Sequence, residues 1–317
     1  MLLTLSVSAL RSKLVPGAGG APAMALTDVP AFAAGELGLR GLALQTEFLV
    51  GADRARLTKV LECADKAGCP VLVLIESNPQ PLASKDQAVA EAAKERLLRV
   101  AQAAHWLGCS AFSLPVLADD SDAELALVAE RLKPVSRRAE RLDLNLCIAP
   151  RQGLTATADR VTELLKKIGG FRVGTLPDFA AAAASGDPIP YLRRLVPYAS
   201  TVLVPAAFEK KKPAKGAKGK AAKDAPPAEK GAPSGDYDMT EFVAVLSAVG
   251  YEGSVSLDYR GDGEPLDELK RVRELLAQAV EADQPALSDL EALLDGDLGE
   301  DEEPEEKPEV DAEEEKE

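Results

Sequence analysis

The sequence predicts a closed (β/α)8 barrel over residues 1–282, followed by an acidic, largely disordered tail over residues 283–317. Three observations support the barrel: short apolar runs alternate with longer segments of helical period, these pairs number eight, and several helical segments end in glycine. Eight such units in about 280 residues match the size of this fold. A doubly wound open sheet is the alternative, but the first loop, PGAGGAPAMALTD, lacks the G-x-G-x-x-G turn typical of a dinucleotide site.

Each predicted strand is an apolar run short enough for a buried sheet, and each predicted helix repeats its apolar residues at helical spacing. The strand and helix of the first four units span 2–10 and 29–37, 41–45 and 54–68, 71–76 and 85–108, and 110–116 and 122–142. Those of the last four span 144–149 and 156–170, 172–178 and 188–198, 200–206 and 239–250, and 253–259 and 264–280. Helical ends such as AGC (67–69) and LGC (107–109) predict left-handed glycine C-caps before the next strand.

Two segments depart from this rhythm. Residues 209–236 form a low-complexity insertion with eight lysines, predicted to be a flexible loop on the side where a barrel's active site opens. Residues 283–317 hold 17 acidic residues against two lysines, which accounts for the whole net charge of −15. We expect the loop to be a solvated linker, a contact for the acidic tail, or, with the tail, a contact for a protein partner. Nucleic acid is not the expected partner.

Composition narrows the class of protein further. Aromatic residues make up 4% of the chain, which suits an aliphatic core better than a platform for stacking bases. No run approaches the roughly 20 apolar residues of a membrane span. The four cysteines show no CxxC spacing, and the N-terminus does not read as a secretory signal. These features predict a cytoplasmic protein with free thiols and no membrane contact.

Four stretches resemble the xylose isomerase-like TIM barrels, specifically the sugar phosphate isomerase/epimerase group. They are LGLRGLALQTEFL (37–49), LNLCIAPRQG (144–153), RVGTLPDFA (172–180) and GYEGSVSLDYRGDGEPLDELKRVRELL (250–276). The resemblance covers about residues 1–280 and is most specific in the last stretch. It implies a divalent metal held by a glutamate late in strand two, a glutamate closing strand five, an aspartate closing strand six, nearby histidines and a glutamate closing strand eight. Such a metal bridges two sugar oxygens while carboxylates move the proton.

Most of these implied ligand positions carry other residues in this chain. The strand-two glutamate position falls on Ala43, and Asp258, a shorter carboxylate, stands at the end of strand eight. The strand-seven ligand run is replaced within VLVPAAF (202–208). Strand six keeps Asp178, but the histidine three residues later is Ala181. The strand-five Glu-Asn-His run falls on Ala149, Pro150 and Arg151.

The remaining polar residues at strand ends are the expected site. Asp178, Asp258 and Glu76 are the candidate catalytic carboxylates, and Asp178 and Asp258 are the metal ligands if a metal binds. Arg151, Gln45 and Tyr259 are the candidate substrate-binding residues. Arg151 either binds a phosphate or carboxylate or neutralises the aspartates, and Glu76 either joins the site or bonds loop backbone or Arg151. His105, the only histidine, is expected to be structural.

Two functional hypotheses follow from these losses. In the first, the barrel belongs to the sugar phosphate isomerase/epimerase group, has lost metal catalysis, uses no cofactor and acts in binding or regulation. In the second, it is an active sugar or sugar-phosphate isomerase or epimerase with a reduced Mn, Mg or Zn site built on Asp178, Asp258 and Glu76. Either hypothesis predicts a small carbohydrate or phosphorylated ligand at the barrel mouth.

Overall fold

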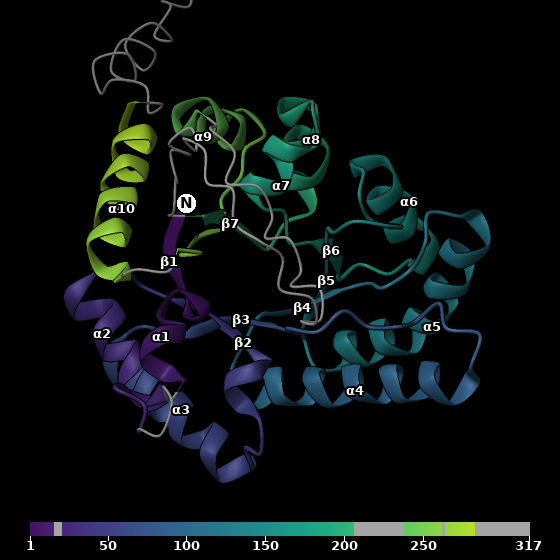
Figure 1. Cartoon of the computed structure of the whole chain (residues 1–317), viewed down its shortest axis with the longest axis horizontal. Helices are drawn as coiled ribbons and strands as arrows, with labels where there is room; N and C mark the ends of the chain where they lie inside the picture. The colour runs from purple at the N-terminus through teal and green to yellow at the C-terminus, as the bar shows by residue number, and fades with distance from the viewer. Residues whose placement is uncertain (16–20, 206–237, 262–263, 283–317) are drawn as a thin grey trace, which may run out of the picture.

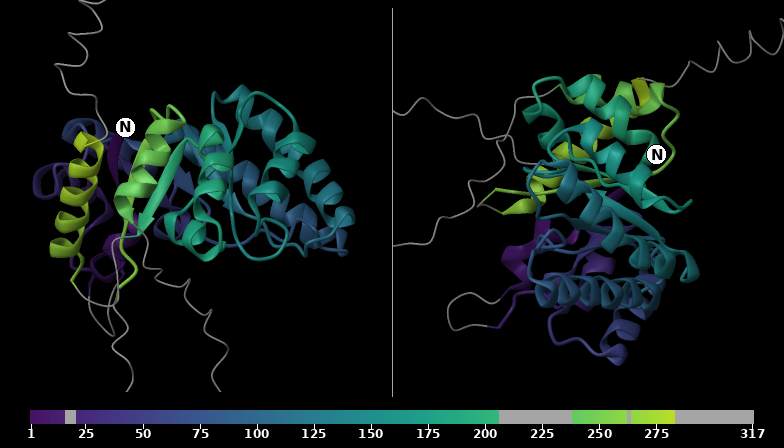
Figure 2. Two further views of the ribbon diagram at one scale, coloured as in Figure 1. Left: turned by 90° about the horizontal axis from the view of Figure 1, so that it is seen from above. Right: turned by 90° about the vertical axis from the view of Figure 1, so that its right-hand side faces the viewer.

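The computed structural model describes residues 1–15, 21–205, 238–261 and 264–282. In these ranges the chain forms a ring of parallel strands surrounded by helices (Figure 1). The strands are β1 Leu2–Ser6, β2 Leu42–Gln45, β3 Val71–Ile75, β4 Ala111–Pro115, β5 Asn145–Ala149, β6 Val173–Thr175, β7 Thr201–Pro205 and β8 Ser254–Asp258. Their C-terminal ends point toward the side of the molecule seen in Figure 1, as the two side views in Figure 2 show.

The helices cover the outside of this ring. They are α1 Arg11–Leu14, α2 Val29–Glu36, α3 Arg54–Ala67, α4 Gln87–Trp106, α5 Asp122–Arg141, α6 Ala158–Ile168, α7 Phe179–Ala184, α8 Pro188–Leu195, α9 Met239–Ala248 and α10 Pro265–Ala282. Short 3-10 turns occupy η1 Val7–Leu10, η2 Leu26–Asp28, η3 Thr46–Leu49 and η4 Val196–Tyr198. Polar N-caps begin several of the helices: the Asp53, Ser121 and Thr157 side chains each accept a backbone N–H of the first turn. Gly68, at φ 60°, ends α3 as predicted.

The strands are hydrogen-bonded in the order β6-β5-β4-β3-β2-β1-β8-β7, all parallel. The ring closes between β6 and β7 through isolated bridges that pair Thr175 with Ala199 and Asp178 with Leu203. At this seam a Cβ on Gly174 would meet the Tyr198 carbonyl at 2.3 Å, so only glycine lets the chain before β7 approach β6 so closely. The predicted (β/α)8 barrel is confirmed.

Two groups of buried side chains fill the fold. The larger lies between the strands and the helices, and the edge-to-face pair of Phe179 and Phe242, with ring centroids 5.1 Å apart, joins α7 to α9 within it. Truncating either buried ring to alanine costs about 3–5 kcal/mol. The smaller group faces the barrel interior and is built from small and medium side chains: Ala43, Val73, Ala111, Cys147 and Leu176. Strand alternation therefore separates an outward face from an inward face on each strand.

The first strand is shorter than predicted. It spans Leu2–Ser6 instead of residues 2–10, and η1 follows it directly. The reason is that the backbone N–H of Ser8 donates to the Gln45 side-chain oxygen at 2.8 Å instead of continuing the ladder with a neighbouring strand. This departure brings Ser8 over the C-terminal end of the barrel.

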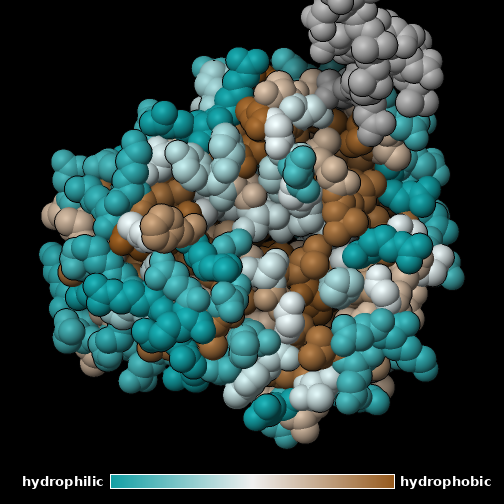
Figure 3. All heavy atoms as spheres, turned by 180° about the vertical axis from the view of Figure 1, so that it is seen from behind, coloured by the Kyte–Doolittle hydropathy of each residue, from teal (hydrophilic) through white to brown (hydrophobic). Residues whose placement is uncertain are grey.

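The opposite end of the barrel carries hydrophobic side chains at its surface. Leu2, Phe171 and Tyr198, which lie at or just before the starts of β1, β6 and β7, are exposed. Figure 3 shows hydrophobic residues running across this face of the molecule. Among the described residues, no helix is long and apolar enough to span a bilayer. The lysine-rich insertion 209–236 and the acidic tail 283–317 lie outside the described residues.

Candidate functional site

A guanidinium joins the two aspartates at the C-terminal end of the barrel. Arg260 donates from Nε to Asp258 Oδ2 at 2.8 Å and forms a second ion pair, through Nη2, with Asp178 Oδ2. Asp258 ends β8, and Asp178 follows β6, so the pairing spans two strands separated by β7. The carboxylates are 9% and 14% exposed and the arginine 35%. The two predicted aspartates are thus brought together, with an unpredicted cation between them.

Asp178 is held by backbone as well as by Arg260. Its Oδ1 accepts the N–H groups of Ala180 and Ala181 at 2.7 and 3.2 Å, which makes it the N-cap of α7. Because α7 begins directly after this residue, the same carboxylate starts the helix and faces the guanidinium. Both oxygens of Asp178 therefore already accept hydrogen bonds from the protein.

Asp258 connects to β1 and β2 through a chain of hydrogen bonds. The Ser8 hydroxyl donates to Asp258 Oδ1 at 2.6 Å, the Ser6 and Ser8 hydroxyls lie 2.7 Å apart, and Gln45 Nε2 donates to Ser6 at 2.8 Å. Since Ser8 gives its proton to the carboxylate, Ser6 must be the donor to Ser8. The donors then run in one direction, from the Gln45 amide through two hydroxyls to a carboxylate. Gln45, a predicted substrate-binding residue, is fixed at both ends of its amide.

Charge in this network centres on Arg260. Burial alone lowers the pKa of an arginine, but Asp178 and Asp258 raise it, so the pKa of Arg260 lies above its ordinary value. The guanidinium therefore stays charged at every physiological pH. It compensates one of the two negative charges directly and is hydrogen-bonded to both carboxylates.

The residues at the mouth do not fit the divalent metal that the family resemblance implies. Within the described residues, no three or more histidine, cysteine, aspartate or glutamate side chains gather into a possible metal site. The two aspartates share Arg260, and the other implied ligand positions carry Ala43, Ala149 and Ala181. A hard cation takes several oxygen or imidazole ligands. This donor set supplies two carboxylates that already hold an organic cation.

The expected inward placement of Glu76 is wrong. Its carboxylate, which is 0% exposed, pairs with Arg96 of α4 at 2.8 and 3.3 Å and accepts the Asn78 N–H at 3.0 Å. The cause is strand phase: Val73 and Ile75 face the barrel interior, so the next residue faces the helices. Of the two structural alternatives, backbone bonding is found, but the cationic partner is Arg96 and not Arg151.

Tyr259 and Arg151 also lie apart from the aspartate network. Tyr259 packs against the larger core group, in phase with Leu257, and not beside Asp258 on the inward face. Arg151 follows β5 at the barrel rim. Among the described residues its guanidinium has no carboxylate within ion-pair distance, so the expectation that it neutralises the aspartates is not met. His105 is exposed near the end of α4.

Sequence reasoning missed Arg260, Ser6 and Ser8. The spacing of each residue along the sequence could have identified it. Arg260 stands two residues after Asp258 and therefore continues the inward-facing side of β8. Thr4, Ser6 and Ser8 likewise alternate along one face of LLTLSVSAL. The search for lost metal ligands directed attention to carboxylates and histidines, whereas the gained groups are a guanidinium and two hydroxyls.

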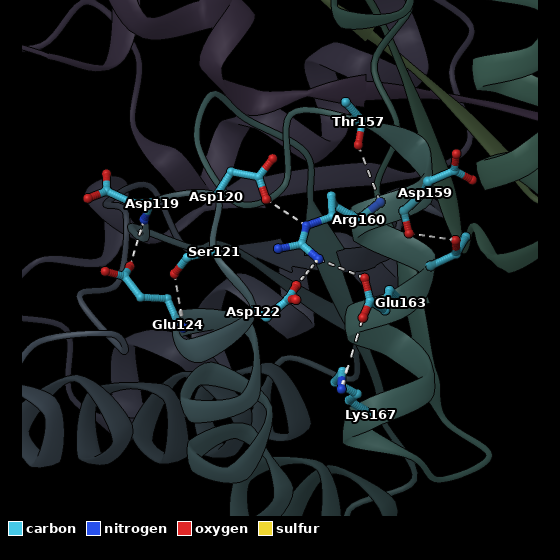
Figure 4. A network of polar contacts seen from close by, with 11 residues as sticks. Asp119, Asp120, Ser121, Asp122, Glu124, Thr157, Asp159, Arg160, Glu163 and Lys167 are labelled. Carbon is cyan, nitrogen blue, oxygen red and sulfur yellow. Dashed lines mark hydrogen bonds and ion pairs between the residues drawn. The ribbon is translucent and has the colours of Figure 1, made fainter.

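A second polar cluster fixes the neighbouring loops of the rim. Arg160, at the start of α6, forms ion pairs with Asp120 of the β4–α5 connection, with Asp122 at the first position of α5, and with Glu163, at 2.6 to 2.9 Å (Figure 4). Its backbone N–H is capped by Thr157. The hydrogen bond to Asp122 is the main cause of a pKa for Arg160 above the ordinary arginine value. The cluster ties the loops after β4 and β5 into one unit.

Comparison with known proteins agrees with the barrel fold. Residues 32–279 match the family model described as xylose isomerase-like TIM barrel. No curated protein matches significantly by sequence.

Solved structures match over most of the chain. The D-psicose 3-epimerase of Clostridium cellulolyticum H10, determined with D-tagatose, has a TM-score of 0.69 at 14% identity, covering 88% of this chain and 99% of its own. L-ribulose 3-epimerase has a TM-score of 0.70 at 14% identity, covering 96% and 99%. The 3-keto-D-glucoside 4-epimerase of E. coli, in its apo form, has a TM-score of 0.63 at 13% identity, covering 86% and 99%. At these identities the likeness shows the shared fold.

Proposed function

Because this chain belongs to the xylose isomerase-like TIM barrel family, we propose that it is a member that binds a small carbohydrate at the barrel mouth without metal-dependent catalysis. The observation that carries the proposal is the position of Arg260 between Asp178 and Asp258. A guanidinium supplies positive charge to both carboxylates, but it is a hydrogen-bond donor and does not coordinate sugar oxygens as a Lewis-acid metal does.

The proposal is also supported by the state of the two candidate bases. Isomerisation and epimerisation by proton transfer need a group that removes a proton from carbon, and that group must have a free lone pair directed at the substrate. Asp258 accepts from Ser8 and Arg260, and Asp178 accepts from Arg260 and two backbone N–H groups. Each carboxylate oxygen thus already accepts at least one hydrogen bond from the protein. We infer that these carboxylates build the mouth and do not serve as the base.

The ligand class comes from the relatives. A solved D-psicose 3-epimerase holds D-tagatose, and another was determined in the presence of D-fructose. We propose that the barrel mouth of this chain likewise takes a small carbohydrate and that binding serves recognition or regulation. The alternative, an active isomerase or epimerase, requires Glu76 at the mouth, and this carboxylate is paired with Arg96 instead.

Calorimetric titration with Mn²⁺, Mg²⁺ and Zn²⁺ tests the proposal, together with the metal content of the purified, untagged protein. The variants are Asp258→Ala and, as a matched control, Asp65→Ala, which removes an exposed aspartate of α3. We expect no stoichiometric metal in the protein and no saturable binding up to millimolar concentration. Tight one-to-one binding that Asp258→Ala abolishes and Asp65→Ala preserves would overturn the proposal and justify a screen for epimerase activity.

We further propose a cytoplasmic location, since all four cysteines are free thiols. The lysine-rich insertion and the acidic tail remain proposed contacts for a protein partner. Their opposite charges predict an association that weakens as salt is raised.

A further inference from the structure

Arg151 lies at the rim of the barrel, and its guanidinium has no partner within the part of the chain that the structure describes. Its Nε is shielded from solvent and has no hydrogen-bond partner, and no ion pair is found for its side chain among the described residues. Arg96, Arg160 and Arg260 each donate Nε to a carboxylate at 2.6 to 2.8 Å. A shielded donor is normally satisfied in a folded protein, and among the described arginines only Arg151 and Arg273 have a shielded Nε without a partner. Of these two, Arg151 lies at the barrel rim.

The backbone of Arg151 is held in place. The Thr155 hydroxyl lies 3.1 Å from the Arg151 N–H, which donates to it, and 3.3 Å from the Arg151 carbonyl oxygen. Thr155 is 0% exposed. Gly153, at φ 95°, lies so close to the β4–α5 connection that a Cβ would meet the Ala118 carbonyl at 2.3 Å, and Leu154 N donates to that carbonyl at 2.9 Å.

This loop is therefore rigid on both sides. The Arg160 cluster in Figure 4 clamps its far end to the β4–α5 connection. An arginine on such a loop loses little further freedom when it binds a ligand, which is the condition for selective recognition.

Asp178 cannot take the role of partner. β5 and β6 are neighbours in the sheet, Arg151 follows the end of β5 by two residues, and Asp178 follows the end of β6 by three. Both oxygens of Asp178 are already occupied by Arg260 and by the N–H groups at the start of α7. Arg260 is the ion-pair partner of both aspartates among the described residues, so the guanidinium of Arg151 is not used by them.

We propose that Arg151 binds an anionic group on the carbohydrate ligand, either a phosphate ester or a carboxylate. The two terminal nitrogens of an arginine form a fork that matches two oxygens of such a group. The inference rests on the proposed function, in that it assigns the charge class of the ligand at the same mouth.

Calorimetry with four probes tests the assignment: fructose, fructose 6-phosphate, gluconate and inorganic phosphate. We expect the phosphorylated sugar or the sugar acid to bind and fructose to bind far more weakly. If inorganic phosphate binds as tightly as the sugar phosphate, the site recognises phosphate alone. That result would overturn the proposal that the ligand is a carbohydrate. Equal binding of fructose and fructose 6-phosphate, or no binding of any anion, would overturn the proposal.

Variants distinguish a specific role of Arg151 in anion binding from a general effect of losing an arginine. Arg151→Gln should weaken anion binding by more than about tenfold, and Arg151→Lys should restore part of it because it keeps the charge without the fork. Thr155→Val, which keeps the side-chain shape but loses the hydroxyl, should weaken it less. The control is Arg273→Gln, since Arg273 also has a shielded, unbonded Nε but lies on α10. An unchanged affinity in Arg151→Gln contradicts the proposal.

The two proposals fail separately. Stoichiometric Mn²⁺ binding together with Arg151-dependent anion binding would overturn the non-catalytic function and leave the anion site intact. Absence of metal binding together with ligand binding that does not depend on Arg151 would leave the non-catalytic function intact and overturn the anion site.

Discussion

The Ser8 hydroxyl donates a 2.6 Å hydrogen bond to the Asp258 carboxylate, joining the start of the barrel to its last strand across 250 residues of sequence. β1 and β8 are neighbours in the sheet, so this bond reinforces a seam that the backbone ladder already closes. It also uses a lone pair of the carboxylate that the family resemblance assigns to metal binding. One contact thus serves the fold and changes the chemistry of the site.

Ser8→Ala should destabilise the protein by about 1–2 kcal/mol, because it removes a partly buried hydrogen bond to a charged group. Urea denaturation measures the change. In a double-mutant cycle with Asp258→Asn, the two effects should be clearly less than additive. Strict additivity would show that the bond contributes nothing to stability.

Arg260→Leu should cost about 2 kcal/mol at pH 7, since it leaves two largely buried carboxylates without their cation. The figure lies between those for exposed and fully buried pairs because Arg260 is 35% exposed. Adding Asp258→Asn should recover part of the loss by removing one negative charge. Arg271→Leu, which breaks an exposed pair with Glu268, is the control and should have little effect. A neutral outcome for Arg260→Leu would show that solvent, and not Arg260, compensates the aspartates.

Glu76→Gln should lower stability by about 1–2 kcal/mol, because it weakens the pair between β3 and α4. Ligand binding at the mouth should stay the same, since Glu76 faces the helix layer. Chemical denaturation and calorimetry of the same variant check both statements. A large loss of ligand affinity without a loss of stability would indicate that Glu76 takes part in ligand binding at the mouth.

Buried thiols should not react in the native protein. Burial raises the pKa of Cys69 and of Cys147 from 9.0 to about 11, and it raises the pKa of Cys109 further. At pH 8 a thiol reagent should therefore label Cys63 first and the other three only after unfolding. The unfolded state ionises these thiols more readily, so the contribution of Cys69 and Cys147 to stability is complete below pH 9 and is lost as pH rises from 9 to 11. Rapid labelling of Cys147 at pH 8 would contradict this account.

The fold was predictable because its signal is repetitive. Apolar runs and helical periods recur eight times, and an error at one boundary, such as the end of the first strand, leaves the barrel unchanged. β6 spans only Val173–Thr175 instead of residues 172–178, since the chain beyond it bridges to β7 through single contacts. Local pattern determines the elements, while their ends depend on contacts far away in sequence.

The site was predictable only in part. Strand alternation placed Asp258 inward, and the same rule, applied to Val73 and Ile75, would have turned Glu76 outward. The pairing of Arg260 with Asp178 joins residues 82 positions apart across the rim, and no local pattern reports it. The sequence places Arg151 just after β5, but only the structure shows that no described carboxylate pairs with it.

A crystal structure of the protein grown with excess Mn²⁺, with anomalous difference data, tests the central claim most directly. The account predicts that the Arg260 guanidinium lies between Asp178 and Asp258 and that no anomalous peak stands beside either carboxylate. A manganese peak coordinated by both aspartates, with Arg260 displaced, would contradict it.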